Sequence, residues 1–526
     1  MGPPGLTKGS EEEARLFEAV PAAPRGLLTA AVICGAFISV MDVSVVNVSL
    51  PHMRGAFGAD LSTITWVATS YSIAQIIMIT MSGWWSTVLG RKRFYLFSYA
   101  LFTLGSALAG TSGSLTEMVI YRAIQGVGGG PLIPIAQAIL RESYPSRQQG
   151  MAMAIFGMGV VVAPAMGPVL GGWLTEEYGW PWVFYINIPI SLAGMLLVKL
   201  YVQDPPYLKR GIKAVDWGGI AFLAVALIGL QIVLERGQGE NWFESDWITA
   251  WAVVTALAVA ALVFWELRVP EPIVDIRILR SIPLSVGSAI ILVFGVALFG
   301  STFILPQFLQ NLLDYTAYDA GAVLLPRGVA LFVVMPLVGW LFNFVDVRLI
   351  LLTGTASLLY SLYLLSLLSL EADFWSLVVP LIFMGLGMPC IFVTLSTVSL
   401  GSVRPAEATA AASIFNLARR VGGNIGFAVL ATQVERGYAF HRVGLVGHVS
   451  ELNEAFLQYK AGLVAFLVRQ EVDPASAPTQ ALALIDRLVN RQATMLAYND
   501  TFWFMLLLFA GVVPLILLLP GRPRGR

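Results

Sequence analysis

The sequence predicts an all-α polytopic membrane protein, and three observations carry that prediction. Of the 526 residues, 57% are hydrophobic and only 12% are charged, whereas a soluble protein carries about 25% charged residues. Apolar runs of about 20 residues recur along the chain, and a helix of that length spans the ~30 Å hydrocarbon core of a bilayer. The runs are continuous rather than alternating, which excludes a barrel of strands as the main interpretation.

Fourteen spans follow from these runs when the chain is read in order. We expect them near residues 27–50, 62–85, 94–112, 116–140, 150–174, 182–202, 215–234, 247–266, 282–304, 320–342, 349–370, 375–400, 408–433 and 500–519. An even number of spans places both termini on the same side of the membrane.

The basic residues are divided unequally between the two sides, and cytoplasmic loops carry the excess of Lys and Arg. The short loops away from the termini hold only Arg54 and Arg236. The segments on the side of the termini hold Arg91, Lys92, Arg93, Arg141, Arg147, Lys209, Arg210, Lys213, Arg268, Arg277, Arg280, Arg348, Arg404, Arg522, Arg524 and Arg526. This asymmetry predicts that both termini are cytoplasmic, with the first span itself directing insertion.

Several functional classes find no support in the sequence. Cys34 and Cys390 lie in apolar spans, so we expect them to pack rather than to form a disulfide framework. His52, His441 and His448 lack the spacing of metal ligands. A phosphate-binding loop needs a Gly-Lys dipeptide, and the chain has none. We therefore expect neither a metal nor a cofactor, and any pumping is driven by a gradient or by another subunit.

Weak internal similarity divides the chain into halves. SGWWSTVLGRKR and LVGWLFNFVDVR both place Gly-Trp, at Gly83 and Gly339, before a short basic loop. Transporters built from repeated bundles show such similarity and bind substrate where the bundles meet. The predicted segments are a cytoplasmic N-terminal segment (1–26), a six-helix bundle (27–202), two additional helices with flanking loops (203–281), the first five helices of the second bundle (282–434), a long outer segment (435–499) and the last span with a basic cytoplasmic tail (500–526).

The outer segment 435–499 carries apolar residues at helical spacing on both sides of a DPASAP break. The pattern predicts two amphipathic helices. They are expected to lie on the membrane surface or to cover the outer face of the protein. The functional alternative is a docking platform for a periplasmic partner.

The first span contains a carboxylate, Asp42. Gly35, Ser39, Asp42, Val46 and Ser49 share one helical face, which is small and polar apart from the valine. A charge at the bilayer centre costs about 2.5–3.5 kcal/mol, so the carboxylate should face protein or a water-filled cavity. Desolvation favours the protonated form, and Asp42 is therefore predicted to bind and release a proton. The alternative is a structural Asp that is permanently paired.

The fourth span contains a cation, Arg122, on the same face as Gln125, Gly126 and Gly129. An intramembrane arginine needs a carboxylate, backbone carbonyls or water. Asp42 is the natural partner, and the alternative is a structural arginine that binds carbonyls. The glycines allow neighbouring helices to approach closely.

The fifth span carries APAMGPVLGGWL. Pro164 and Pro168 each remove a backbone hydrogen bond, so a bend is expected. Gly167 and Gly171 form a seam of small residues, with Gly172 beside it.

These strings carry a family resemblance. DVSVVNVSLP in the first span, RAIQG in the fourth and GPVLGG in the fifth together resemble signatures of the major facilitator superfamily, and the last is similar to its antiporter motif. Fourteen spans, with FYINIP and AGAVLLPRG, resemble the drug:proton antiporter branch typified by the multidrug exporters EmrB and QacA. The resemblance covers residues 25–434 and the last span.

The resemblance implies a major facilitator fold, a bacterial inner-membrane location and alternating access driven by proton entry. It implies that Asp42 is a proton site coupled to Arg122. It also implies two partners, a periplasmic membrane-fusion adaptor and an outer-membrane channel.

One motif departs from the family. The inner-loop motif has the form G-x-L-a-D-R-x-G-R-K, and this chain keeps its glycines and its last two cations, namely Gly83, Gly90, Arg91 and Lys92. Thr87 and Val88 replace the acid and the first arginine. The charge latch between the halves is therefore in doubt, and the two remaining cations serve either gating or topology.

The remaining candidates for a substrate cavity are residues inside the spans. They are Ser39, Val46, Gln75, Gln125, Asn187, Asn416, Arg419 and Arg420. At least one of the adjacent arginines should face the cavity or a polar partner. Gln75 and Asn187 either bind substrate or cross-link helices. Arg327 lies nearer the outer end of its helix and could snorkel to the interface.

The sequence as a whole predicts a secondary active transporter rather than an enzyme, one that expels amphipathic drugs or toxic compounds in exchange for protons. An exporter of one metabolite, siderophore or lipid would have a similar sequence, and a substrate panel would separate the two. A membrane enzyme should show a clustered nucleophile or metal set, which we do not find. A receptor needs no proton coupling. No nucleic-acid partner is expected.

Overall fold

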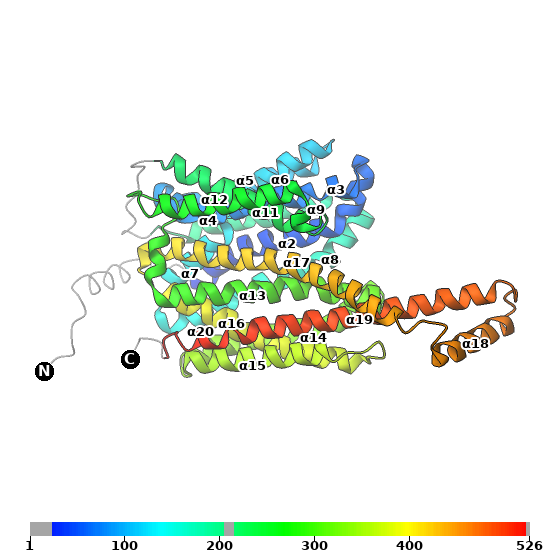
Figure 1. Cartoon of the computed structure of the whole chain (residues 1–526). Coiled ribbons are helices and arrows are strands. Elements are labelled where there is room, and N and C mark those ends of the chain that lie inside the picture. Colours follow the sequence, from blue (N-terminus) through cyan, green and yellow to red (C-terminus); the bar gives the residue numbers. More distant parts are fainter. Residues whose placement is uncertain (1–23, 205–214, 522–526) are drawn as a thin grey trace.

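The computed structural model describes residues 24–204 and 215–521, and these residues form a bundle of long helices (Figure 1). The first half contains α2 (Arg25–Phe57), α4 (Trp66–Leu89), α5 (Arg91–Gly110), α6 (Leu115–Gly129), α7 (Leu132–Ser143), α8 (Ser146–Glu177), α9 (Trp182–Tyr185) and α10 (Asn187–Tyr201). An additional pair follows, α11 (Trp217–Arg236) and α12 (Asp246–Glu266). The second half contains α13 (Ile282–Gln307), α14 (Ala317–Leu341), α15 (Val347–Ser366), α16 (Phe374–Gly401), α17 (Ala408–Val446), α18 (Glu454–Arg469), α19 (Ala477–Ala510) and α20 (Val513–Ile516).

Each of the fourteen expected spans falls on a helix, although two of these helices are more polar than the rest. Eleven helices in the described ranges are long and apolar enough to cross a membrane, or twelve if the bent α8 is one span. The two that fall short are α5, which begins with Arg91, Lys92 and Arg93, and α17, which carries Arg419 and Arg420. Polar residues lower the apolar character of both helices, yet both pack against helices that do qualify.

The two halves form two bundles that meet along α4 and α17 and along α8 and α14. The additional pair lies at this junction, because α11 contacts α4 of the first bundle and α17 of the second. Predicted segment 1–26 and the basic tail beyond 521 fall largely outside the described residues, as do Lys209, Arg210 and Lys213.

The halves are closed against each other at one end. We call it the basic end because Arg91 and Arg141 of the first half bond there to the turn that contains Arg404, and Arg348 bonds to the end of the last span. Gly83 packs against α17 so closely that an added Cβ would lie 2.8 Å from the Cα of Ala410. Gly339 packs against α8 in the same way, with an added Cβ 2.8 Å from the carbonyl oxygen of Gly150. The two glycines matched in sequence therefore make equivalent contacts, one in each half.

The outer segment differs from the expectation that it lies on the membrane surface or covers the outer face. α17 and α19 continue beyond the bundle at the end opposite the basic end, and α18 folds back beside α19 (Figure 1). The second amphipathic stretch is not a separate helix, because it forms the first half of α19 and runs into the last span. We call α18, the start of α19 and their connection the hairpin. Pairing of α19 with α17 supports its extension, as in the bond from Arg442 to Asp486 at 3.0 Å.

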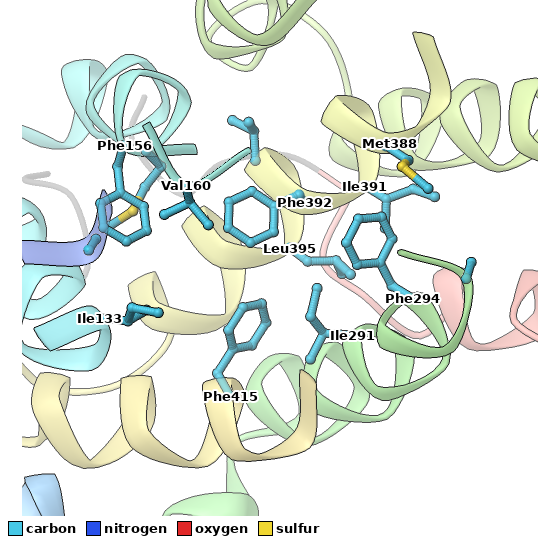
Figure 2. Packing of buried hydrophobic residues seen from close by; sticks show 14 of the residues in the cluster. Ile133, Phe156, Val160, Ile291, Phe294, Met388, Ile391, Phe392, Leu395 and Phe415 are labelled. Atoms are coloured by element: carbon cyan, nitrogen blue, oxygen red, sulfur yellow. The ribbon is translucent and has the colours of Figure 1, made fainter. Parts of the chain in front are cut away.

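A group of buried apolar side chains fills the space between the bundles, and we call it the central apolar cluster (Figure 2). It includes Phe156 and Val160 of α8, Phe294 of α13, Met388 and Phe392 of α16, and Phe415 of α17. The ring centroids of Phe294 and Phe392 are 6.3 Å apart, and Phe392 lies beside Val160 in Figure 2. Because both bundles contribute to it, a relative movement of the bundles must separate its two sides.

Candidate functional site

The buried carboxylate of Asp42 pairs with the guanidinium of Arg122, as the sequence predicts. Asp42 lies in the middle of α2 and is fully buried, and Arg122 lies in α6 with 1% of its surface exposed. The distance from Arg122 Nη1 to Asp42 Oδ2 is 2.6 Å. Removing one partner of such a buried pair costs about 3–5 kcal/mol, because the other charge is left uncompensated.

Two amides complete the surroundings of the Asp42 carboxylate. Gln125 Nε2 and Asn187 Nδ2 each donate to Asp42 Oδ1 at 2.8 Å. The same two nitrogens lie 3.1 Å from the Ser106 hydroxyl oxygen, and that hydroxyl donates to the Phe184 carbonyl at 2.8 Å. The carboxylate therefore joins α2 to α6 and α10, and Ser106 adds α5. Both amides are predicted cavity residues, but the sequence does not predict their contact with Asp42. Ser106 was missed, because its hydroxyl carries no charge to mark it.

Arg122 is held from three further directions. Its Nε donates to the Val67 carbonyl at 3.1 Å, and its Nη1 donates to Gln125 Oε1 at 2.6 Å. The guanidinium carbon lies 4.2 Å from the centre of the Tyr71 ring, which is a cation–π distance. These contacts fix the cation next to Asp42 and leave it little freedom to find another partner.

A second polar group lies one helical turn away from Asp42 on α2. Ser39 donates to the Gly129 carbonyl at 3.0 Å and accepts from Gln75 at 3.1 Å. Gln75 also donates to the Tyr71 hydroxyl at 3.2 Å, and that hydroxyl donates to the Ser39 carbonyl. Gln75 thus cross-links α4 to α2, which is one of the two roles that the sequence left open.

Val46 lies apart from these polar groups. Its side chain is fully buried in an apolar cluster with neighbours that include Val45, Val183 and Phe184. Val46 and Asp42 share one face of α2, but that face contacts different helices along its length. Asp42 therefore lies among polar side chains and Val46 among apolar ones.

The proline-glycine string of α8 packs against α2. The helix bends by 42° between its segments Arg147–Pro164 and Val169–Glu177, and Pro168 lies in that break, so the expected bend is present. Added Cβ atoms would lie 2.3 Å from Ser44 at Gly167 and 2.9 Å from the Val45 carbonyl at Gly171, whereas Gly172 has no neighbour within 4 Å. The first two glycines bring α8 against the helix that carries Asp42.

The polar residues of α17 reach across the junction of the bundles. Asn416 Nδ2 donates to Gln137 of α7 at 2.5 Å, and Arg419 Nη2 donates to Asn416 Oδ1 at 3.2 Å. Arg420 Nη2 donates to the Ser72 hydroxyl of α4 at 3.4 Å. These three residues therefore lie at the interface of the bundles rather than with Asp42.

A further acid near this interface, Glu235 of α11, was missed because it falls just past the expected end of its span. Its carboxylate accepts from the Thr69 hydroxyl of α4 and, at 2.7 Å, from Gln231. Gln231 in turn accepts from Asn424 of α17 at 2.6 Å. α11 of the additional pair is thus bonded to both bundles.

The inner-loop motif contacts the second half through Arg91, although Thr87 and Val88 replace its acid and its first arginine. Gly90 has φ 85°, a conformation that favours glycine and turns the chain from α4 into α5. Arg91 is 1% exposed, pairs with Glu142 of α7 and donates to the Pro405 carbonyl of the second half at 3.0 Å. Lys92 instead remains within the first half, where its Nζ donates to the Lys199 carbonyl.

The arrangement around Asp42 makes its charge state and its packing interdependent. The ionised carboxylate accepts hydrogen bonds from three side chains on two neighbouring helices. Protonation would remove the charge that balances Arg122 and would convert one acceptor oxygen into a donor. A proton at Asp42 would therefore weaken the attachment of α2 to α6 and α10.

The sequence and the fold are similar to those of known membrane transporters. The family model described as Major Facilitator Superfamily matches residues 32–427. The chain is 31% identical over 495 residues to the multidrug export protein EmrB of Escherichia coli (strain K12), an alignment that covers 93% of this chain and 94% of that protein. It is 28% identical to the fatty acid resistance protein FarB of Neisseria gonorrhoeae over 91% of this chain and 93% of that protein. The fold is similar to that of the proton:xylose symporter XylE, with a TM-score of 0.58, 13% identity and coverage of 93% and 95%.

Proposed function

The chain belongs to the Major Facilitator Superfamily, in its EmrB-like group of drug exporters, and on that premise we propose that it expels amphipathic compounds in exchange for protons that bind Asp42. Membership makes it a multi-pass membrane transporter of small molecules rather than an enzyme. The exchange for protons and the role of Asp42 are our proposal and do not follow from family membership.

The observation that carries the proposal is the full burial of the Asp42 carboxylate among Arg122, Gln125 and Asn187. An ionisable group within a membrane is costly and is usually functional. Here its protonation state determines how three helices are held together. Proton binding and a change in helix packing are therefore two aspects of one event.

We assign the basic end to the cytoplasm, because cytoplasmic loops carry the excess of Lys and Arg. The closed contacts at Gly83 and Gly339, together with the Arg91 bond to Pro405, then describe a cytoplasmic gate that is shut. In the proposed cycle, Asp42 receives a proton from outside while this gate is closed. The bundles then rock, Asp42 releases the proton inside, and a new compound binds.

Proton flux in liposomes tests the role of Asp42. Full-length protein in vesicles with an imposed pH gradient should acidify the interior in response to an exported compound, and Asp42→Asn should abolish this response. Glu177→Gln is the matched control, because Glu177 is an exposed acid at the end of α8. Wild-type flux in Asp42→Asn would refute the assignment.

We also propose that the hairpin docks a periplasmic membrane-fusion adaptor, which would continue to an outer-membrane channel. α18 buries none of its residues, and it exposes Leu457, Tyr459 and Phe466 beyond the bundle. Exposed apolar groups of this kind mark interaction surfaces. The long reach of α19 from the bundle supports contact with a protein rather than with lipid.

A further inference from the structure

Two arginines in the second bundle have no acidic partner among the described residues. Arg327 lies in α14 and Arg419 lies in α17, both inside the membrane region. Across residues 24–204 and 215–521, no carboxylate forms an ion pair with either of them. In contrast, Arg122 pairs with Asp42, and Arg91 pairs with Glu142. The second bundle therefore holds an excess of positive charge at membrane depth.

Arg419 has unused donors. Its side chain is 6% exposed. In the part of the chain that the structure describes, its Nη2 donates only to Asn416, at 3.2 Å, and its Nε has no hydrogen-bond partner. A guanidinium offers five N–H groups in a planar fork that matches an oxyanion. Asn416 is itself bonded to Gln137 of the first bundle at 2.5 Å. A ligand that binds Arg419 would therefore alter a hydrogen bond between the two bundles.

Arg327 has weaker contacts still. Within residues 24–204 and 215–521, its guanidinium makes one hydrogen bond, from Nη2 to the thioether sulfur of Met388 at 3.6 Å. A thioether is a weak acceptor and carries no charge. The snorkelling that its place near the outer end suggested is thus replaced by a contact with α16, inside the bundle.

Arg420 differs from these two arginines. It is attracted by the carboxylate of Glu235 and donates to Ser72 at 3.4 Å, and its guanidinium lies 5.7 Å from the Phe299 ring. Its charge therefore has partial compensation. The uncompensated pair is Arg327 and Arg419.

Both uncompensated arginines adjoin the central apolar cluster. Arg327 contacts Met388, and Phe415 precedes Arg419 by four residues, about one turn of α17. Met388 and Phe415 lie on different sides of the cluster in Figure 2, with Phe294 and Phe392 between them. When the bundles move apart, an apolar surface is exposed between two cations.

We propose that the exported compounds are amphipathic anions, acids with an apolar body, whose head binds Arg419 or Arg327 and whose body occupies the central apolar cluster. This inference rests on the proposed export function and names its substrate class. A single charge-assisted, bidentate contact of an arginine with an oxyanion supplies the specificity. A cationic head would meet two unbalanced guanidinium groups.

A pair of probes with one apolar body tests this inference. Binding of pyrenebutyrate and of pyrenebutyltrimethylammonium to the full-length protein in lipid nanodiscs is measured by pyrene fluorescence against empty nanodiscs. We expect the anion to bind at least about tenfold more tightly than the cation, as charge-assisted hydrogen bonds allow. Equal affinities, or a preference for the cation, would overturn the proposal.

Variants locate the site. Either Arg419→Gln or Arg327→Gln should weaken pyrenebutyrate binding about tenfold, depending on which arginine binds the head. The matching lysine variant should have an intermediate affinity, because it keeps the charge but loses the bidentate contact. Arg442→Gln is the control, because Arg442 lies outside the bundle and pairs with Asp486. Unchanged anion affinity in both glutamine variants would refute the inference. If a variant does not fold, the comparison of the two probes on the wild type still decides.

The two proposals fail in different ways. Proton coupling without a preference for the anion would refute only the proposed substrate class. A preference for the anion without proton flux would refute only the proposed proton coupling.

Discussion

Asp42 and Arg122 lie 80 residues apart in the chain and form an ion pair of 2.6 Å in which both side chains are almost completely shielded from solvent. Each charge makes the burial of the other tolerable, so neither can be removed alone without penalty.

Arg122→Ala should therefore destabilise the protein by about 3–5 kcal/mol, and adding Asp42→Asn should recover part of that loss. The reason is that the double variant no longer buries an uncompensated carboxylate. Thermal unfolding in detergent gives the stability of Arg122→Ala, of Asp42→Asn, of the double variant and of the wild type. If the double variant is destabilised by the sum of the two single changes, the charges do not depend on each other.

Asn187→Ala should destabilise the protein by about 1.5–3 kcal/mol, which is the usual contribution of a hydrogen bond to a charged group. Asn187 of α10 donates to the Asp42 carboxylate of α2 at 2.8 Å, so the variant loses one bond between these helices. Thermal unfolding in detergent measures the change. Ser191→Ala is the control, because Ser191 is buried one turn further along α10 and has no hydrogen-bond partner among the described residues. Equal stability of Asn187→Ala and the wild type would show that this amide does not hold α10 to α2.

Gly83→Leu should open the basic end. A side chain at this position would collide with Ala410 and force α4 away from α17. If the gate opens as one unit, the distant contact between α8 and α14 should loosen as well. The readout is maleimide labelling of Ala154→Cys, a fully buried position in α8, in a protein whose two native cysteines are replaced by serine.

The rate of labelling should rise several-fold with Gly83→Leu and remain low with Gly401→Leu, since Gly401 has no neighbour within 4 Å. Labelling that stays at the wild-type rate would show that the two contacts open independently.

Replacing residues 447–476 with a short Gly-Ser linker should abolish adaptor capture and leave transport in liposomes intact. The deletion removes α18 and retains the pairing of α17 with α19, for example Gly437 against Ala497. Capture of a co-expressed membrane-fusion adaptor measures docking, and substrate-driven proton flux measures folding and activity. Adaptor capture at the wild-type level would exclude α18 and its connection to α19 as the docking site.

Much of the fold and the centre of the site could be predicted from the sequence, because charges and prolines inside apolar spans are conspicuous. Asp42 and Arg122 were found in this way, and so was the bend of α8. The hydrogen bonds of Ser106 and Asn187 to the same network could not be predicted, because a hydroxyl or amide in a span is common and its partner depends on which helices become neighbours.

The hairpin was misplaced and Glu235 was missed, because the ends of helices are harder to predict than their apolar centres. Span ends were set by hydropathy, yet α19 continues through the boundary as one helix and Glu235 lies one residue beyond another boundary. Hydropathy detects the lipid environment of a segment and not the helix geometry, which continues wherever backbone hydrogen bonds do.

The unbalanced arginines also bear on energy supply. If Arg327 and Arg419 select an anion and Asp42 carries one proton, outward movement of the anion and inward movement of the proton both transfer positive charge inward. Each cycle would then be electrogenic by two charges, and a potential of 100 mV would contribute about 4.6 kcal/mol, twice the value for a single charge. Export should consequently continue in vesicles that have a membrane potential and no pH difference.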